Sequence, residues 1–445
     1  MNAPPTHFGS SAARHGLRNR RLALLMLLFG AGWAFSVSFF GAIYGSELLA
    51  IALLPTLKPL RLIRTNANLR CVLTAYGLIL LGLVVSDIAN ATAFDLALKA
   101  WAIPIFAAVL LIFVTAALGK DPISNLKYYL FASFLANLLL GNAAYRVTGV
   151  GGSGINWADI SANENLMKVA VVPFLMPLLA LTIFHLRERR RLVAQLIALG
   201  AAAFLFAHDA RSAGLIAFAM AMAVKAFRRP SQVHAKQLFR LLGVGLVAGY
   251  LAYAGYVYYS FNYNPDGHNA SQLSLVEHPY NPVMLLGIGR PEWLVAPEVL
   301  AGRPIVGYGS WAEDKDQSFA LIRAIATDTV DIYYTTFGER NYWIPTHSVV
   351  LASWIWGGLI GLFGALLLVV AFLRIAAKAL NARPEAIVFI VYFSTGLLWD
   401  LFFSPIQSLR LTAPIALGFL IAVAALPSRR APRLGSGPID VRAAI

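Results

Sequence analysis

The sequence predicts an all-α polytopic membrane protein with about 12 transmembrane helices and one large periplasmic loop between spans 9 and 10. Of the 445 residues, 59% are hydrophobic and only 13% are charged, whereas a soluble domain carries about 25% charged residues. The apolar residues gather in long runs, and most basic residues lie between these runs. We therefore attribute the net charge of +15 to basic loops that lie at one face of the membrane. Nucleic acid is not an expected partner.

The N-terminal region predicts a basic cytoplasmic tail followed by a helical hairpin. Residues 1–21 are polar and arginine-rich, and we expect the first part of this tail to be disordered. Residues 22–57 contain a single charged residue, Glu47, and are too long for one span of about 20 residues. The sequence FFGAIYG is therefore expected to form a bend between two helices. Carboxylates inside a membrane often mark function, but Glu47 lies close to the bend and could equally reach water.

Ten further apolar segments complete the expected set of spans. They are residues 71–85, 101–118, 128–140, 166–186, 192–207, 212–227, 241–259, 347–373, 386–403 and 411–426. In this division, residues 22–260 hold spans 1–9 and residues 347–426 hold spans 10–12. The hydrophilic stretch between them, residues 261–346, is the large periplasmic loop, and residues 427–445 form a cytoplasmic tail.

The distribution of charge favours an orientation with both termini in the cytoplasm. This division places most of the 36 Lys and Arg residues on the cytoplasmic side and most of the 21 Asp and Glu residues outside. A shift by one span would invert that asymmetry, against the positive-inside rule. The first apolar run leads straight into another, so we interpret it as a retained anchor rather than a cleaved signal peptide. The single cysteine, Cys71, excludes an intrachain disulfide.

Arg211 is the first candidate functional residue. It stands in the sequence HDARSAG at the outer end of a predicted span, and small residues follow it. The guanidinium group offers a fork of donors that suits a phosphate group at the outer membrane surface. Two other interpretations remain open, because the side chain could reach lipid headgroups or pair with Asp209.

Arg290 and His347 flank the second half of the large loop. Arg290 precedes EWLVAPEVLAG, in which the apolar spacing predicts a short interfacial helix ending before Gly302. Arg290 is either a second phosphate ligand or a surface residue paired with Glu292. His347 begins the tenth span and is either a general base or a capping residue at the helix entrance. Three glycines in that span are expected to permit close helix packing: Gly357, Gly358 and Gly361.

The sequence favours no cofactor and no metal ion. It contains no phosphate-binding loop or dinucleotide glycine motif, so ATP-driven transport within this chain is not expected. Its histidines and carboxylates lack the spacing typical of metal ligands. The charged run EDKDQ at residues 313–317 lacks the spaced oxygen ligands of a calcium loop and is expected to be a solvated loop face.

Taken in order, these motifs resemble the O-antigen ligase and O-antigen polymerase superfamily. The resemblance rests on HDARSAG, on R-x-E-W followed by RPIVGYGS, and on H-S-x(8)-G-G-L-x-G leading into an apolar helix. The sequence ANEN before the span at residues 166–186 is a weaker match to an asparagine-containing motif of that family. The plan of spans with a large loop between spans 9 and 10 is also similar.

The resemblance implies an enzyme that transfers a glycan from an undecaprenyl-pyrophosphate carrier to an acceptor at the periplasmic face of the bacterial inner membrane. It implies an inverting reaction without metal or nucleotide. Arg211 and Arg290 would hold the donor pyrophosphate, and His347 would orient or deprotonate the acceptor hydroxyl. Arg303 stands where many relatives carry a different residue, so its role is open. Arg340 is either a further phosphate ligand or a plain loop residue.

Three functions remain open after the resemblance. An O-antigen ligase would transfer the glycan to lipid A–core, whereas a surface polysaccharide polymerase would extend a growing lipid-linked glycan. The modest length and the absence of an added soluble domain favour the ligase. A lipid-linked oligosaccharide transporter would need ionisable groups along a path through the spans, which are nearly free of them. The expected partners are the lipid-linked donor, the acceptor glycan and membrane lipids.

Overall fold

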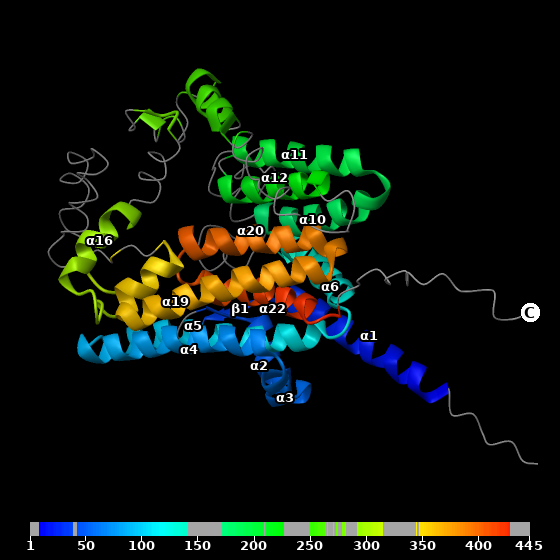
Figure 1. Ribbon diagram of the computed structural model, residues 1–445, viewed down its shortest axis with the longest axis horizontal. Coiled ribbons are helices and arrows are strands. Elements are labelled where there is room, and N and C mark those ends of the chain that lie inside the picture. Colours follow the sequence, from blue (N-terminus) through cyan, green and yellow to red (C-terminus); the bar gives the residue numbers. More distant parts are fainter. Residues whose placement is uncertain are drawn as a thin grey trace, which may run out of the picture.

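The computed structural model shows a protein built almost entirely of α-helices (Figure 1). It describes residues 9–38, 42–140, 171–208, 210–226, 247, 250, 251, 253–263, 265, 270, 273, 274, 278–281, 292–314, 344 and 347–427. Four helical segments of this part of the chain are long and apolar enough to cross a membrane. They are α4 (Ala67–Ala89), α5 (Phe94–Leu118), α19 (Val349–Ala382) and Pro384–Phe403, which contains α20 (Ile387–Phe403). The predicted all-α class is confirmed, and these helices are those expected of a membrane protein.

The remaining elements complete the described fold. They are α1 (Gly9–Gly32), β1 (Ser36–Ser38), β2 (Ala42–Tyr44), α2 (Gly45–Leu53), η1 (Leu54–Leu57), α3 (Pro59–Thr65), α6 (Pro122–Leu140), α10 (Val172–Arg189), α11 (Arg191–Ala207), α12 (Arg211–Ala226), α16 (Glu292–Gly302), η3 (Pro384–Ala386), α21 (Ser408–Leu411) and α22 (Ala413–Ala424). Residues 253–263 are helical as well. Helices thus fall on the predicted spans, although α11 and α22 are shorter than a full membrane crossing. The number of spans stays a prediction.

The helical hairpin expected over residues 22–57 is found only in part, because the second helix is short. α1 begins at Gly9, so it includes the arginine-rich half of the expected tail. The two-stranded antiparallel sheet β1–β2 follows, and then α2 with only nine residues. The Glu47 carboxylate accepts from the backbone N–H of Tyr44 at 2.9 Å, which closes the first turn of α2. The helix then passes into η1, where Pro55 cannot donate a backbone hydrogen bond.

Glycines allow α4 and α19 to pack with their backbones close together, and the two helices run side by side in Figure 1. A β-carbon on Gly82 of α4 would lie 2.5 Å from the amide nitrogen of Gly361 and 2.7 Å from the carbonyl oxygen of Gly357. A β-carbon on Gly364 would lie 2.9 Å from the carbonyl oxygen of Ala75. The predicted role of Gly357 and Gly361 in close helix packing is confirmed.

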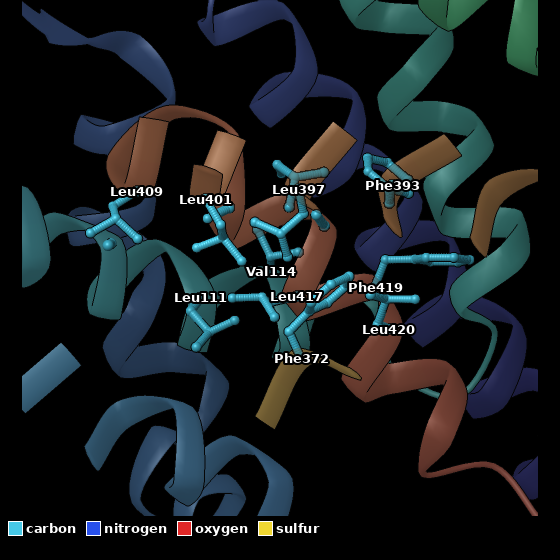
Figure 2. Packing of buried hydrophobic residues seen from close by; sticks show 14 of the residues in the cluster. Leu111, Val114, Phe372, Phe393, Leu397, Leu401, Leu409, Leu417, Phe419 and Leu420 are labelled. Atoms are coloured by element: carbon cyan, nitrogen blue, oxygen red, sulfur yellow. The ribbon is translucent and has the colours of Figure 1, made fainter. Parts of the chain in front are cut away.

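α22 lies in the centre of the bundle, surrounded by side chains of α5, α19 and α20 (Figure 2). Every residue from Ala413 to Val423 is buried, as expected for a helix that is apolar on all sides. The ring of Phe419 lies 5.5 Å from the ring of Phe393 on α20. A β-carbon on Gly418 would lie 2.7 Å from Val114 of α5. The core therefore joins the N-terminal and C-terminal halves of the chain.

Candidate functional site

The carboxyl-terminal end of α20 is the meeting point of the elements that hold or adjoin the predicted site residues. α12, which begins with Arg211, packs along α20. The side chain of Ile216 lies 3.5 Å from the position of a β-carbon on Gly396. One turn closer to the start of α12, Ser212 lines the same cavity as Asp400. Arg211 therefore stands at the end of α12 that faces the end of α20.

α16 is attached to the same end of α20. The indole Nε1 of Trp293 donates to the carbonyl oxygen of Phe402 at 2.9 Å, and the two rings lie 5.9 Å apart. The predicted short helix before Gly302 is confirmed as α16, which ends at that glycine. Arg290 lies outside the described residues, two positions before the start of α16. Arg340 lies outside them as well.

The start of α19 makes the third attachment to α20. Ser348 is fully buried, and its hydroxyl accepts from the backbone N–H of Leu351 and donates to the carbonyl oxygen of Leu401, both at 3.3 Å. Ser348 is thus the N-cap of α19. The preceding residue, His347, is exposed. The capping role that was one interpretation of His347 therefore belongs to Ser348.

The Arg211 side chain contacts the helical segment at residues 253–263. Its guanidinium donates to the hydroxyl of Tyr256 at 2.8 Å and lies 5.3 Å from the centre of that ring. The neighbouring Tyr253 donates its hydroxyl to the carbonyl oxygen of Pro279 at 2.5 Å. Arg211 is half-buried. Its hydrogen bond to Tyr256 gives it a direct protein partner, in addition to any lipid headgroup that it contacts. Asp209, the other partner considered for it, lies outside the described residues.

The segment at residues 303–310 docks into a break in α19. Gly358 has a φ of 61°, and a β-carbon there would lie 2.1 Å from the carbonyl oxygen of Ile305. The break frees the backbone N–H of Leu359 to donate to Ile305 at 2.9 Å, while Tyr308 donates its N–H to Ile355 at 2.7 Å. Only glycine fits this conformation and this close approach.

The other side of the same segment is held by the end of α4. The buried carboxylate of Asp87 accepts from the backbone N–H of Ser310 at 2.6 Å, from the Ser310 hydroxyl at 2.9 Å and from the indole of Trp101 at 2.7 Å. The N–H of Gly309 donates to the Ser86 hydroxyl at 2.9 Å. Asp87 could not be predicted from the sequence, because its Ser310 partner lies 223 positions away along the chain.

Arg303 belongs to this docked segment. Its guanidinium donates to the side-chain carbonyl of Asn90 and lies 5.7 Å from the centre of the Tyr308 ring. The Asn90 amide in turn donates to the carbonyl oxygen of Gly307 at 3.2 Å. These contacts place Arg303 between the end of α4 and the loop.

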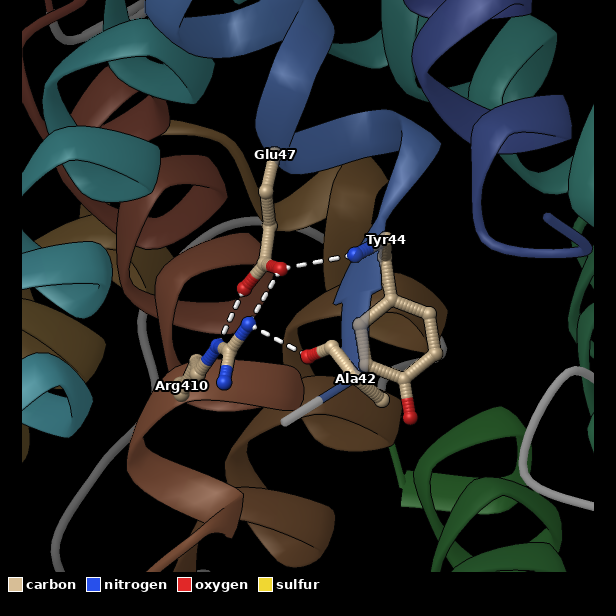
Figure 3. A network of polar contacts seen from close by, with 4 residues as sticks. All are labelled: Ala42, Tyr44, Glu47 and Arg410. Carbon is tan, nitrogen blue, oxygen red and sulfur yellow. Dashed lines mark hydrogen bonds and ion pairs between the residues drawn. The ribbon is translucent and has the colours of Figure 1, made fainter. Parts of the chain in front are cut away.

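Glu47 forms a buried ion pair with Arg410 of α21 (Figure 3). The Glu47 side chain is fully buried, and both of its carboxylate oxygens accept from the Arg410 guanidinium. Arg410 also donates to the carbonyl oxygen of Ala42 at 2.8 Å and lies 4.6 Å from the centre of the Phe106 ring. Glu47 stood out in the sequence as a charge within an apolar run, whereas Arg410 was missed. The pair connects the β2–α2 junction to the segment between α20 and α22.

A cavity of about 410 Å³ lies between α1, α6, α10, α12, α20 and the start of α22. The carboxyl group of Asp400 is at its wall, where Oδ1 accepts from the Ser404 hydroxyl at 2.8 Å and Oδ2 accepts from the Thr412 hydroxyl. Asp400 was also missed. The available signal was a carboxylate inside the apolar run at residues 386–403, where an ionisable residue usually has a function.

Within the described part of the chain, no group of three or more His, Cys, Asp or Glu side chains could hold a metal ion. The elements that begin at Arg211 and just after His347 meet the end of α20, where the Ser348 hydroxyl and the Asp400 carboxyl group also lie. No family model matches the chain, and no curated protein is similar to it.

Proposed function

We propose that the protein is a membrane glycosyltransferase of the O-antigen ligase type. It would move a glycan from an undecaprenyl-pyrophosphate carrier to an acceptor at the periplasmic face of the bacterial inner membrane. The observation that carries the proposal is the meeting of α12, α16 and the start of α19 at the end of α20. These elements hold or adjoin the three residues with the required chemistry: Arg211, Arg290 and His347.

The proposal includes a topology of about 12 spans with both termini in the cytoplasm and residues 261–346 in the periplasm. The concentration of basic residues in the loops on one side supports this orientation. In it, the start of α12, the start of α19 and the end of α20 face the periplasm. A lipid-linked donor that has been moved across the membrane presents its head group on that side.

In the proposed reaction, a hydroxyl oxygen of the acceptor bonds to the anomeric carbon of the donor glycan. The bond from that carbon to the pyrophosphate oxygen breaks, and the pyrophosphate leaves with the electron pair. His347 takes the hydroxyl proton, and Arg211 and Arg290 stabilise the charge that develops on the leaving group. Attack from the side opposite the leaving group inverts the anomeric carbon. The exposure of His347 suits a base that must reach a bulky acceptor.

The test uses purified protein, a synthetic undecaprenyl-pyrophosphate glycan, and no added metal ion or ATP. Wild type is compared with His347→Ala, and with His278→Ala as a control for the loss of another exposed histidine. Lipid A–core is supplied as the acceptor in one reaction and omitted in a second. We expect transfer to lipid A–core by wild type and by the control, and its loss in His347→Ala.

The alternatives give different results in the same assay. Longer lipid-linked glycans formed from the donor alone would identify a polymerase. An intact donor in both reactions, with the protein folded, would refute transfer to these acceptors. Movement of the donor across a vesicle membrane would then favour the transporter.

A further inference from the structure

The cavity beside Asp400 has the size and lining of a ligand site. Its volume of about 410 Å³ falls in the range of about 300–1,000 Å³ that is common for small-molecule sites. Most of its lining is apolar, and several of the lining residues are aromatic: Trp33, Tyr44, Tyr129, Tyr392, Phe393 and Trp399. Such side chains offer broad flat faces together with polar edges.

Polar groups occur at several points of the wall. Asp400 of α20, Ser212 of α12 and Thr412 just before α22 line the cavity, and so do Ser133 and Asn137 of α6. The Asp400 oxygens accept one hydroxyl each, from Ser404 and from Thr412. A carboxylate has about four lone-pair positions, so acceptor capacity remains for a hydroxyl of a ligand.

We propose that this cavity binds one sugar ring of the acceptor glycan, with a ring hydroxyl donating to Asp400 and a ring face packed on the aromatic wall. A pyranose ring combines C–H faces with a rim of hydroxyl donors, which matches an aromatic wall with one carboxyl group. A plain hydrocarbon chain would leave that carboxyl group without a further partner. Naming the sugar as part of the acceptor rests on the proposed transferase function, whereas sugar binding itself does not.

The position of the cavity fits an acceptor site. Ser212 follows Arg211, the proposed donor ligand, and lines the cavity. Leu401 follows Asp400, and its carbonyl oxygen accepts from Ser348, the neighbour of His347. A ring bound against Asp400 would therefore lie beside the helix that carries the donor ligand, at the same end of α20 as the segment that carries the base.

The inference can be tested without catalytic turnover, by measuring whether a bound sugar protects an introduced thiol from chemical labelling. The Ser212→Cys variant is placed in phospholipid nanodiscs and labelled with a maleimide, and the rate at each thiol is read by peptide mass spectrometry. Cys71 on α4 is the only native cysteine, is half-buried, and does not line the cavity. It therefore serves as an internal control. The probes are octyl glucoside below its micelle-forming concentration, maltose without a chain, and octanol without a sugar.

At a probe concentration about ten times its dissociation constant, we expect octyl glucoside to slow labelling of the introduced thiol about ten-fold. Maltose should protect it as well, while the rate at Cys71 stays constant. Equal protection by octanol would identify a hydrocarbon site and overturn the inference, and so would a lack of protection by both sugars. Sugar protection in a protein without transferase activity would overturn the proposed function alone.

Substitutions then test the two features of the wall. Asp400→Asn and Trp399→Leu in the Ser212→Cys background should each reduce protection by maltose. Asp95→Asn, which changes an exposed carboxylate on α5, should leave it unchanged. Two wall variants are used so that a folding defect in one does not end the test. Full protection in both, with the Cys71 rate unchanged, would contradict the proposed contacts.

Discussion

The Glu47–Arg410 pair gives the sharpest stability prediction. Removing one member of a buried ion pair costs about 3–5 kcal/mol, because the other charge is left buried without compensation. The Glu47 side chain is 0% exposed and that of Arg410 is 16% exposed. Arg410→Leu leaves a fully buried carboxylate that still accepts from the Tyr44 N–H but has lost its counter-charge, so we expect a cost of about 5 kcal/mol.

Glu47→Gln should cost less, about 3 kcal/mol, because Arg410 keeps its hydrogen bond to Ala42 and has some access to water. The double variant Glu47→Gln/Arg410→Leu removes both charges. Its cost should fall below the sum of the single costs by about 2–3 kcal/mol, as expected for groups in direct contact. The assay is equilibrium unfolding in mixed micelles by SDS titration, followed by tryptophan fluorescence.

Asp95→Asn is the matched control, since it makes the same kind of change in an exposed pair. Lys99 and Asp95 lie 3.5 Å apart, and their side chains are 42% and 66% exposed. Such pairs contribute about 0–1 kcal/mol. If Glu47→Gln destabilised the protein no more than this control, the pair would not anchor the β2–α2 junction. Strict additivity in the double variant would show that the two side chains act independently.

Three further predictions concern the loop and the proposed site. Gly358→Ala should reduce the free energy of unfolding by more than about 3 kcal/mol, since it adds strain at positive φ and a clash with a carbonyl oxygen. Gly77 has open space for a β-carbon, so the control Gly77→Ala should be neutral or slightly stabilising. Thermal unfolding of both variants is the measurement. Asp87→Leu should cost about 2–3 kcal/mol, because it leaves buried donors without their acceptor, and a shift of tryptophan emission should accompany it. Arg211→Lys keeps the charge but loses the fork of donors, so we expect glycan transfer to fall about 10-fold or more; unchanged transfer would exclude a bidentate phosphate contact.

The sequence was sufficient where the structure depends on local pattern. Apolar runs predicted the helices, because burial of backbone groups in an apolar medium favours helices strongly. The spacing within EWLVAPEVLAG and its terminal glycine predicted α16, and the glycines of α19 predicted close packing. In each case the information lies within a few turns of one element.

The sequence was not sufficient where partners lie far apart along the chain. Arg410 is separated from Glu47 by 363 positions and Ser310 from Asp87 by 223, so neither hydrogen bond follows from spacing. The β1–β2 sheet was missed because each strand has only three residues, which is too short for an alternating pattern to be recognised. The sequence motifs predicted Arg211 and His347 as site residues. That the elements next to them both pack on α20 could be learned only from the structure.

The reason that α20 can gather these elements lies in the chemistry of a helix end. The last four carbonyl groups of a helix have no partner within it. At the end of α20, the carbonyl of Leu401 accepts from Ser348 and the carbonyl of Phe402 accepts from Trp293. α16, inside the large loop, and the segment that follows the loop thus satisfy groups that would otherwise need water. Because the same contacts cap α20 and position the segments next to Arg290 and His347, any change that frays this helix end must also displace the proposed site.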